Sequence, residues 1–459
     1  MQSKKIKYLF LSVNNYLGLT LPIWMESRKS LVINFILDLL IFFLIFQYKT
    51  AYLEIFSFLK IIIFCLNWGL ISYLLGRYSK STKANQIYLD LYFYIQNTFF
   101  AVLVCYLIDK TSIIFLKNVY PFGLNLFLLF GFGSFLIQTL RYLLINSNNK
   151  ISKKLVYIVG GEDDIENFKQ NTKSYLINEK LIVINLETFY KIIKKNQFEF
   201  ITIIFVSDYD YLENYEIVLR ESTKKNLEIL TCSEWFEKYL QKIPPEYISK
   251  NALDFKEKYL NNFSSRVKRF SDILVSVFLL IITFPILIIS AILIKMEDNG
   301  PIFYVQKRTG LYEQIFRIIK LRSMKVNSEQ KGPVWSKKSD KRVTKVGFFL
   351  RKSRIDELPQ LWNVLIGEMS LIGPRPERPE IEENLNKKIE HYKFRHIIKP
   401  GLSGWAQVNF PYGASVIDSK EKLSYDFFYI KNKSIWLDIL IFIKTVKVIL
   451  TLSGSNPIK

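Results

Sequence analysis

The chain has few of the residues that build metal clusters and disulfide frameworks. Among 459 residues there are three cysteines and two histidines. Cys65, Cys105 and Cys232 lie far apart, and two of them lie in apolar runs. We therefore expect neither a disulfide framework nor a metal cluster. Since His391 and His396 are the only histidines, a His-ligated metal and Ser–His catalysis are both unexpected.

Acidic residues are scarce relative to basic ones, with 41 Asp and Glu against 63 Lys and Arg and a net charge of +22. Such an excess suits either nucleic acid or an anionic membrane surface. The sequence contains no zinc-finger spacing, RNA-binding aromatic motif or basic zipper. We therefore expect a lipid bilayer, and no nucleic acid, as partner. A small-residue cleavage site is also missing after the first apolar run, so no cleavable signal peptide is expected.

Half of the residues are hydrophobic and 15% are aromatic, which points first to membrane-spanning segments. A helix needs ~20 residues to cross the hydrocarbon core. Four apolar runs come near that length, at residues 31–47, 61–75, 91–108 and 121–140. Lys and Arg are concentrated in residues 1–30, 76–88 and 141–155. This positive-inside bias predicts a four-helix transmembrane domain over residues 1–150 with both of its ends in the cytoplasm.

One acidic residue, Asp38, lies inside the first apolar run. Ionisable residues inside a membrane are costly and often mark functional sites. Pairing with another helix, or a position near a polar face, explains Asp38 more simply. We favour this second interpretation.

A fifth apolar run, residues 273–294, contains no charge and has Pro285 near its centre. Hydropathy predicts a fifth crossing, which would place the rest of the chain outside the cell. A helix that breaks at Pro285 and returns to the same face would keep it in the cytoplasm. Proline removes a backbone hydrogen bond, and Thr283 is a local partner for the freed backbone. From the residues alone both topologies stay open.

Residues 151–262 are more polar and contain three short buried-strand patterns, at residues 154–161, 201–208 and 226–231. Helical patterns between them predict a small Rossmann-like α/β domain. A dinucleotide fingerprint needs Gly-x-Gly-x-x-Gly, but here Gly160 and Gly161 are followed by the acids Glu162, Asp163 and Asp164. These acids would repel a pyrophosphate, so a structural or regulatory role is the better interpretation.

The last part of the chain combines carboxylates with fixed cations. Asp356 and Glu357 are expected on a basic helix that also carries Arg351, Lys352 and Arg354, and Arg375 stands between two prolines. Ser353-x-x-Asp356 also matches a helix-capping pattern, which explains the acids without any chemistry. Capping does not explain Arg375, whose restricted backbone suits a guanidinium that binds phosphate. The combination favours a phosphate site.

Several motifs in residues 266–459 resemble the bacterial sugar transferase family, the monotopic polyprenyl-phosphate phosphoglycosyl transferases. The matching pieces are KRFSD at 268–272, KLRSM at 320–324, DELPQLWNV at 356–364, GEMSLIGPRPE at 367–377, KPGLSGWAQV at 399–408 and Tyr425-Asp426. Four spans and an α/β module in front resemble the large members of exopolysaccharide and O-antigen systems. The family usually has Ser-Pro at the helix break, and here the pair is Phe284-Pro285.

The resemblance implies a two-step reaction. Asp356 would attack the sugar-bearing phosphate of a UDP-sugar and release UMP, and undecaprenyl phosphate would then take the phosphosugar from the enzyme. Glu357 would bind Mg²⁺. The residues that would contact phosphate groups are Lys320, Arg322, Arg354 and Arg375, with Gln407 as a weaker candidate. UDP-glucose is the first choice of donor and UDP-galactose the second.

The resemblance also implies an architecture. A mainly α, monotopic catalytic domain would occupy residues 263–459, with a re-entrant helix at 273–294 broken at Pro285. It would face the cytoplasm at the bacterial inner membrane. The run at 434–452 would lie along the inner leaflet or pack on the domain. The oligomeric state is open, and a homodimer is one arrangement to consider.

Two other functions compete with this interpretation. The apolar helices would suit a transporter or flippase, but their spans contain few ionisable groups. A nucleotide-sugar oxidoreductase or epimerase would need cofactor binding in residues 151–262, where the glycine fingerprint is incomplete.

Overall fold

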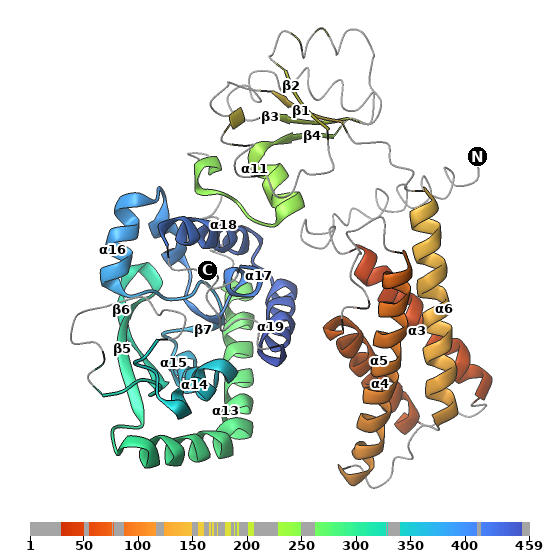
Figure 1. The fold of residues 1–459 in the computed structure, drawn as a ribbon, viewed down its shortest axis with the longest axis horizontal. Helices are drawn as coiled ribbons and strands as arrows, with labels where there is room; N and C mark the ends of the chain where they lie inside the picture. The colour runs from red at the N-terminus through yellow and green to blue at the C-terminus, as the bar shows by residue number, and fades with distance from the viewer. Residues whose placement is uncertain are drawn as a thin grey trace. The chain divides into compact units, whose positions relative to one another are not determined.

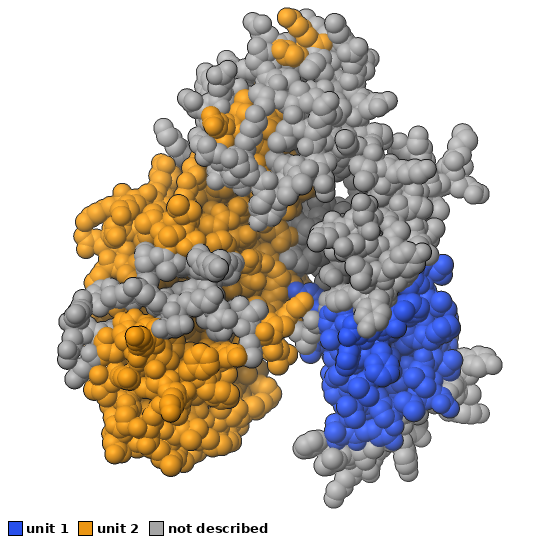
Figure 2. Space-filling view, in the orientation of Figure 1, with its two compact units in different colours: residues 1–154, 178–180 blue, residues 155–177, 181–459 orange. Residues whose placement is uncertain are grey.

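The computed structural model describes most of the C-terminal part and the cores of the preceding elements. The described residues are 29–49, 55–75, 77, 87–115, 124–148, 155–159, 165–166, 168, 172, 180–184, 188, 191, 201–205, 228–248, 262–326, 328, 340–410 and 415–451. The chain divides into two compact units, Met1–Lys154 with Asn178–Lys180, and Leu155–Ile177 with Leu181–Lys459 (Figure 2).

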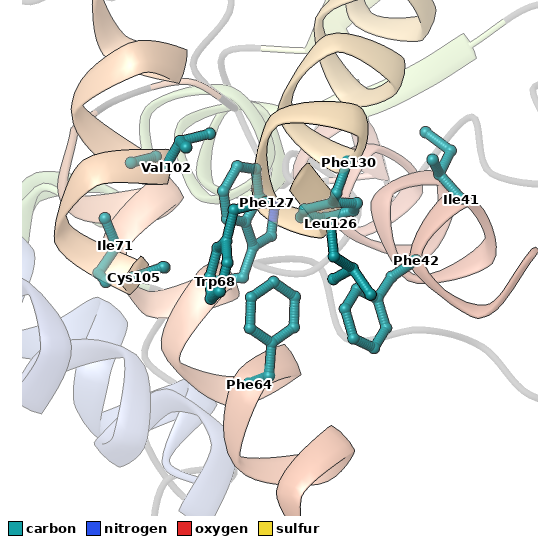
Figure 3. Packing of buried hydrophobic residues seen from close by; sticks show 11 residues of the cluster. Ile41, Phe42, Phe64, Trp68, Ile71, Val102, Cys105, Leu126, Phe127 and Phe130 are labelled. Carbon is teal, nitrogen blue, oxygen red and sulfur yellow. The ribbon is translucent and has the colours of Figure 1, made fainter. Parts of the chain in front are cut away.

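The first unit contains helices that coincide with the four predicted apolar runs. They are α3 (Lys29–Lys49), α4 (Ile55–Leu74), α5 (Ile87–Phe115) and α6 (Leu124–Asn148). Helix α6 packs against α3 and α5, and α5 packs against α4. Their shared core is rich in aromatic rings (Figure 3), with Phe42 stacked on Phe64 at 4.3 Å between ring centroids and Trp68 edge-on to Phe130 at 4.5 Å.

A buried polar network crosses this core at Asp38. Its carboxylate accepts hydrogen bonds from Trp68 Nε1 at 2.9 Å and Ser134 Oγ at 2.6 Å, and lies 3.5 Å from Arg77 Nη1. Arg77 also donates to Thr98 of α5. Asp38 therefore pairs with residues of the other helices, as the sequence interpretation favoured.

The second unit begins with a four-stranded sheet of order β2-β1-β3-β4. Its strands are β1 (Leu155–Val159), β2 (Lys180–Ile184), β3 (Ile201–Phe205) and β4 (Glu228–Thr231). β3 lies between β1 and β4 and is parallel to both. The three predicted strands are present, and β2 was not predicted. The turn at residues 160–164, on which the nucleotide-binding argument depended, lies outside the described residues.

A short irregular segment connects β4 to the rest of the unit. It contains α11 (Cys232–Trp235), the π-helical turn η1 (Phe236–Leu240) and the 3₁₀ turn η2 (Pro245–Tyr247). Thr231 and Glu234 form a capping box that starts α11. Trp235 and Phe236 pack with the sheet residues Ile158 and Ile204 in one core.

Helix α13 (Asn262–Asp298) covers the fifth apolar run and has Pro285 in its interior. Within the described residues, only the segment Ser264–Asp298 is long and apolar enough to cross a membrane by length and composition. Figure 1 shows α13 bent into two arms, as expected of a helix containing proline. The helix is continuous from Asn262 to Asp298, with Pro285 inside it. Pro285 has no N–H group to bond the carbonyl of Ile281. The Thr283 hydroxyl donates instead to the Leu279 carbonyl at 2.7 Å. Thr283 is therefore not the partner of the freed carbonyl, contrary to the prediction.

The remaining elements form the C-terminal part of the second unit. An antiparallel hairpin, β5 (Phe303–Thr309) and β6 (Ile315–Leu321), turns through η3 (Leu311–Glu313). Then follow α14 (Lys345–Ser353), η4 (Ile355–Glu357), α15 (Gln360–Ile366), β7 (Ser370–Ile372), α16 (Pro379–Lys388), η5 (Tyr392–Ile397), β8 (Gly401–Ser403), α17 (Trp405–Asn409), α18 (Val416–Asn432) and α19 (Ile435–Leu450). β7 pairs in parallel with β8. Gly401 lies so close to the Gly373 backbone that a Cβ would clash there.

Helix α19 has a buried face and an exposed apolar face. Leu437 and Ile441 are fully buried, and the helix contacts β7, β8 and α17. Trp436 and Leu450 are exposed. One face therefore packs on the domain, as one of the two sequence interpretations expected, and the other is free to meet an apolar environment.

Candidate active site

The acidic pair lies on a separate turn after the basic helix. Thr344 starts α14 by accepting a hydrogen bond from Gly347 N, and the helix ends at Arg354, whose φ of 60° is left-handed. The following 3₁₀ turn η4 carries Asp356 and Glu357. The prediction that these acids lie on the basic helix itself is therefore wrong, because the left-handed residue redirects the chain before them.

The capping alternative for the acidic pair is also wrong. The Ser353 hydroxyl donates to the carbonyl of Phe349 at 2.8 Å, within its own helix. No side chain caps η4. The two carboxylates are therefore free of the helix-capping role that would have explained them without chemistry.

Glu357 lies in a cluster of cations. Its Oε1 atom is 2.7 Å from Arg375 Nη2, 3.4 Å from Arg354 Nη1 and 3.5 Å from Lys320 Nζ. Burial would raise the pKa of the carboxyl, but Arg375, Lys320 and Arg354 outweigh it and hold the pKa well below its ordinary value. Burial also lowers the pKa of Lys320 to about 8. Because its own pKa is lowered, Glu357 is ionised at neutral pH.

Asp356 has the opposite environment, although it is the adjacent residue. Its side chain is buried, and its Oδ1 atom has no hydrogen-bond partner within the described residues. Burial, followed by repulsion from Glu357, raises the pKa of Asp356 to about 6. Near pH 7 such a carboxylate is ionised and poorly solvated, which is the state that a nucleophile needs.

The segment that carries Arg375 is held by its carbonyl groups. The Pro374 carbonyl accepts from Gly401 N at 2.8 Å and the Arg375 carbonyl from Arg395 Nη2 at 2.8 Å. The Pro376 carbonyl accepts from Arg308 Nη1 at 3.0 Å. Because proline also restricts φ, this backbone has little freedom. The backbone from which the Arg375 side chain extends to Glu357 is therefore held in place.

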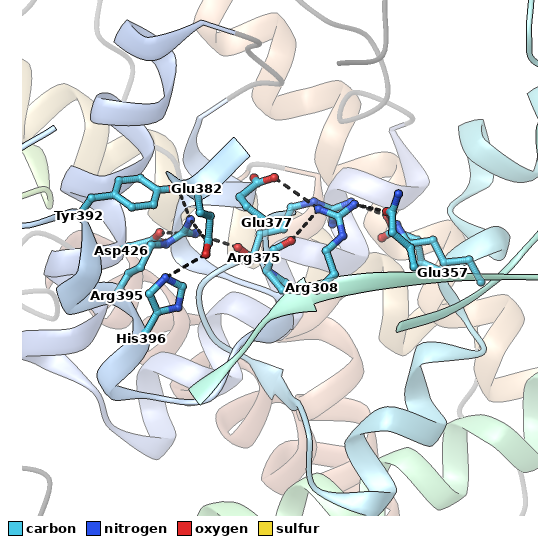
Figure 4. A network of polar contacts seen from close by, with 12 residues as sticks. Arg308, Glu357, Arg375, Glu377, Glu382, Tyr392, Arg395, His396 and Asp426 are labelled. Atoms are coloured by element: carbon cyan, nitrogen blue, oxygen red, sulfur yellow. Dashed lines mark hydrogen bonds and ion pairs between the residues drawn. The ribbon is translucent and has the colours of Figure 1, made fainter. Parts of the chain in front are cut away.

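A polar network continues behind this segment (Figure 4). Arg395, which is buried, bonds Asp426 Oδ2 at 3.0 Å and the Tyr392 hydroxyl at 2.5 Å. Glu382 lies 3.7 Å from Arg395 Nη1 and 3.3 Å from His396 Nε2. Burial raises the pKa of Asp426 to about 6 despite its arginine partner. The network joins α16, η5 and α18 to the Pro-Arg-Pro segment.

Three of the five predicted phosphate-binding residues meet at Glu357, namely Lys320, Arg354 and Arg375. The other two have their observed contacts elsewhere. Arg322 pairs with Asp298 at the end of α13, and Gln407 Nε2 donates to the Leu402 carbonyl at 3.2 Å.

Sequence reasoning did not single out the surrounding charged residues as site residues. They are Arg308, Glu377, Arg395, Lys422 and Asp426. Glu377 and Asp426 lie in matching family motifs, so both had a signal. Arg395 had no such signal, because its contact with the Arg375 carbonyl forms only in the folded chain.

The donor set at the acidic pair suits a hard cation. Mg²⁺ prefers oxygen ligands and is often held by one or two carboxylates together with phosphate oxygens. Glu357 is ionised, and one oxygen of the adjacent Asp356 has no hydrogen-bond partner in the part of the chain that the structure describes. Among the described residues no three His, Cys, Asp or Glu side chains cluster as a ready metal site. The residues therefore fit a magnesium ion that arrives with a phosphate-bearing substrate.

These features place a buried carboxylate beside a second carboxylate that lies in a cluster of cations. The sequence profile of the bacterial sugar transferase family matches residues 263–452, which contain the whole site. The chain belongs to this family, and the resemblance inferred from the motifs is confirmed.

Named relatives match the same part of the chain. The UDP-N-acetylgalactosamine-undecaprenyl-phosphate N-acetylgalactosaminephosphotransferase of Aeromonas hydrophila is 49% identical over 190 residues, 41% of this chain and 45% of the relative. The UDP-glucose:undecaprenyl-phosphate glucose-1-phosphate transferase of Xanthomonas campestris pv. campestris is 39% identical, over 40% of this chain and 39% of the relative. The chain therefore spans less than half of the length of either. A putative undecaprenyl-phosphate N-acetylgalactosaminyl 1-phosphate transferase of Bacillus subtilis is 47% identical over 28% of this chain and 72% of the relative.

Proposed function

We propose that this protein transfers a sugar-1-phosphate from a UDP-sugar to undecaprenyl phosphate and releases UMP. The observation that carries the proposal is the acidic pair, in which a buried Asp356, with one oxygen unpaired among the described residues, adjoins Glu357 in its cluster of cations. The names of the relatives support the same donor and acceptor classes. Family membership favours this reaction over transport or oxidoreduction, because the matched segment contains the complete site.

Asp356 is the proposed nucleophile. One of its carboxylate oxygens attacks the phosphorus atom next to the sugar, and the bond from that phosphorus to the UMP oxygen breaks. UMP leaves with the bonding electron pair, and an aspartyl phosphosugar remains. A phosphate oxygen of undecaprenyl phosphate then attacks the same phosphorus and releases the Asp356 carboxylate. Two displacements replace one direct transfer between two anions.

The cations around Glu357 bind and orient the phosphate groups. Lys320, Arg354 and Arg375 already converge there, and the guanidinium of Arg375 has the planar donor geometry that phosphate oxygens accept. Arg322 and Gln407 stay candidates, and their observed contacts are with Asp298 and the Leu402 carbonyl. Glu357, with Asp356 beside it, would hold Mg²⁺, which would neutralise charge on the phosphate groups.

The remaining architecture is proposed in the same terms. Helices α3 to α6 would form a transmembrane domain over residues 1–150, and residues 151–262 a Rossmann-like structural or regulatory domain. Residues 263–459 would be the catalytic domain, with α13 re-entrant at Pro285 and the site facing the cytoplasm at the bacterial inner membrane. The bend of α13 and the exposed apolar face of α19 support this placement.

The sugar is the least constrained part of the proposal. Sequence reasoning preferred UDP-glucose and then UDP-galactose. The Xanthomonas relative is named for glucose, and the more similar Aeromonas relative for N-acetylgalactosamine. UDP-N-acetylgalactosamine therefore joins the two hexose donors in the test.

The test is UMP release by the full chain with undecaprenyl phosphate, Mg²⁺ and each UDP-sugar. We expect release with one donor, its loss in Asp356→Asn, and a phosphosugar on the peptide that contains Asp356 by mass spectrometry. The matched control is Asp340→Asn, which changes an aspartate that pairs with Arg342 away from the acidic pair. Substantial turnover by Asp356→Asn would contradict the nucleophile, and no UMP from any donor would contradict the reaction.

A further inference from the structure

Arg395 is buried and makes contacts of two different kinds. Its Nη2 atom lies 3.0 Å from Asp426 Oδ2 and donates to the carbonyl of Arg375 at 2.8 Å. The other terminal nitrogen, Nη1, donates to the Tyr392 hydroxyl. The contact with Asp426 neutralises the buried charge of Arg395. The contact with the Arg375 carbonyl fixes the main chain of Arg375.

The carbonyl that Arg395 holds belongs to the residue that contacts Glu357. Arg375 Nη2 lies 2.7 Å from Glu357 Oε1, the shortest of the three cation contacts of that carboxylate. The prolines on either side have no N–H group to anchor this backbone. The carbonyls on either side of Arg375 and its own carbonyl all accept hydrogen bonds, and the donor to the Arg375 carbonyl is the side chain of Arg395.

We propose that Arg395, with Asp426 as its counter-ion, is a positioning residue that sets the guanidinium of Arg375 against the acidic pair. Arg395 does not itself touch Glu357 or Asp356 in this arrangement and acts through the Arg375 main chain. The inference rests on the proposed function, because its consequence is measured in that reaction.

The chemistry of arginine explains why the position needs this residue. A planar guanidinium presents several N–H groups in fixed directions, so it can bond a carboxylate, a hydroxyl and a carbonyl together. Lysine would keep the positive charge beside Asp426 but would not hold all three groups in the same geometry. Arg395→Lys therefore separates charge from positioning. Small displacements of a group that orients substrate lower turnover strongly.

The experiment is a double-mutant cycle on UMP release. We expect Arg395→Lys to lower kcat roughly tenfold or more in the otherwise wild-type chain, with a smaller change in KM for the UDP-sugar. In an Arg375→Lys background, the same substitution should change kcat less than about twofold, because the group that it positions has already gone. The matched control is Arg342→Lys, which alters an arginine paired with Asp340 and should leave kcat unchanged.

Thermal unfolding of each variant separates positioning from general stability. Equal losses of kcat in both backgrounds would overturn the proposal, as would an unchanged kcat for Arg395→Lys. Asp426→Glu, which keeps the negative charge, should recover more activity than Asp426→Asn, and the reverse order would also contradict the inference. If the unmodified chain releases no UMP from any donor, the proposed reaction fails instead, and this result is distinct from the others.

Discussion

At the residue scale, the pKa values of two neighbouring carboxyl groups are shifted in opposite directions. Asp356 and Glu357 share one turn, yet burial raises the pKa of the first while Arg375, Lys320 and Arg354 overcome burial at the second. Neighbouring residues on a tight turn point in different directions, so their surroundings can differ. This difference suits the proposed role of Asp356 as a nucleophile, and it leaves Glu357 ionised at neutral pH.

The pH dependence of the reaction follows from Asp356. Its pKa is raised to about 6, so acid below that value protonates the carboxylate and removes the nucleophile. We expect kcat/KM for the UDP-sugar to fall as pH decreases through about 6 and to level off between about 6 and 8, where Lys320 begins to lose its charge. Initial rates of UMP release at saturating Mg²⁺ would show this limb. A rate that is flat from pH 5 to 8 would contradict the assignment.

At the element scale, α18 is shared between the site and the segment that follows the sheet. It carries Asp426, which binds Arg395 behind the site. At its two ends it is clamped by the residues after β4. Glu237 accepts from Lys431 at 2.8 Å and Asn432 at 2.7 Å, and Lys242 lies 2.6 Å from Glu421. The sheet is therefore tied to the same helix that supports Arg375.

Loss of the buried Glu237 charge should weaken this clamp. Glu237→Gln keeps the side-chain shape but turns a charged acceptor into a neutral one, and Lys431 is partly exposed. We expect a lower Tm in detergent, equivalent to about 1–2 kcal/mol. Glu383→Gln, whose carboxylate pairs with Lys387 on an exposed face, serves as the control and should leave Tm unchanged. Equal shifts for both variants would show that the clamp is not significant.

At the scale of the whole molecule, each unit has its own buried charges. Asp38 and Arg77 lie in the first unit, surrounded by aromatic side chains, with Arg77 4.7 Å from the centre of the Trp68 ring. The acidic pair and its cations lie within the segment that the family profile matches. Stability of the helical unit and chemistry at the site can therefore be changed separately.

Asp38→Asn should destabilise the chain without altering the chemistry. It leaves the Arg77 charge buried without its acidic partner, which costs about 3–5 kcal/mol in comparable sites. We expect less folded protein and a lower Tm, with unchanged turnover per folded molecule. The double variant Asp38→Asn/Arg77→Gln removes both charges and should recover part of the Tm. A turnover defect in correctly folded Asp38→Asn would contradict this separation.

The agreement between the sequence predictions and the structure differs from residue to residue. Asp356, Glu357 and Arg375 were singled out from local motifs, and the structure brings Lys320 and Arg354 to Glu357 as well. Arg322 was expected at the phosphate site because it belongs to the matching family motif at 320–324. However, β6 ends at Leu321, so the alternation of side chains stops and Arg322 turns to Asp298. The left-handed Arg354 likewise separates the acids from the helix on which they were expected.

The sequence by itself determined the apolar helices, the proline within the fifth run, the strands with β-branched runs and the family motifs, because periodicity and short motifs act over a few neighbouring residues. Only the tertiary structure decided that Arg395 holds Arg375 and that Asp426 neutralises Arg395, since these partners are 20 and 31 residues apart in the chain. It also decided that the pKa of Asp356 is raised and that of Glu357 lowered. Acidity depends on burial and on the distance to every nearby charge, and folding sets both.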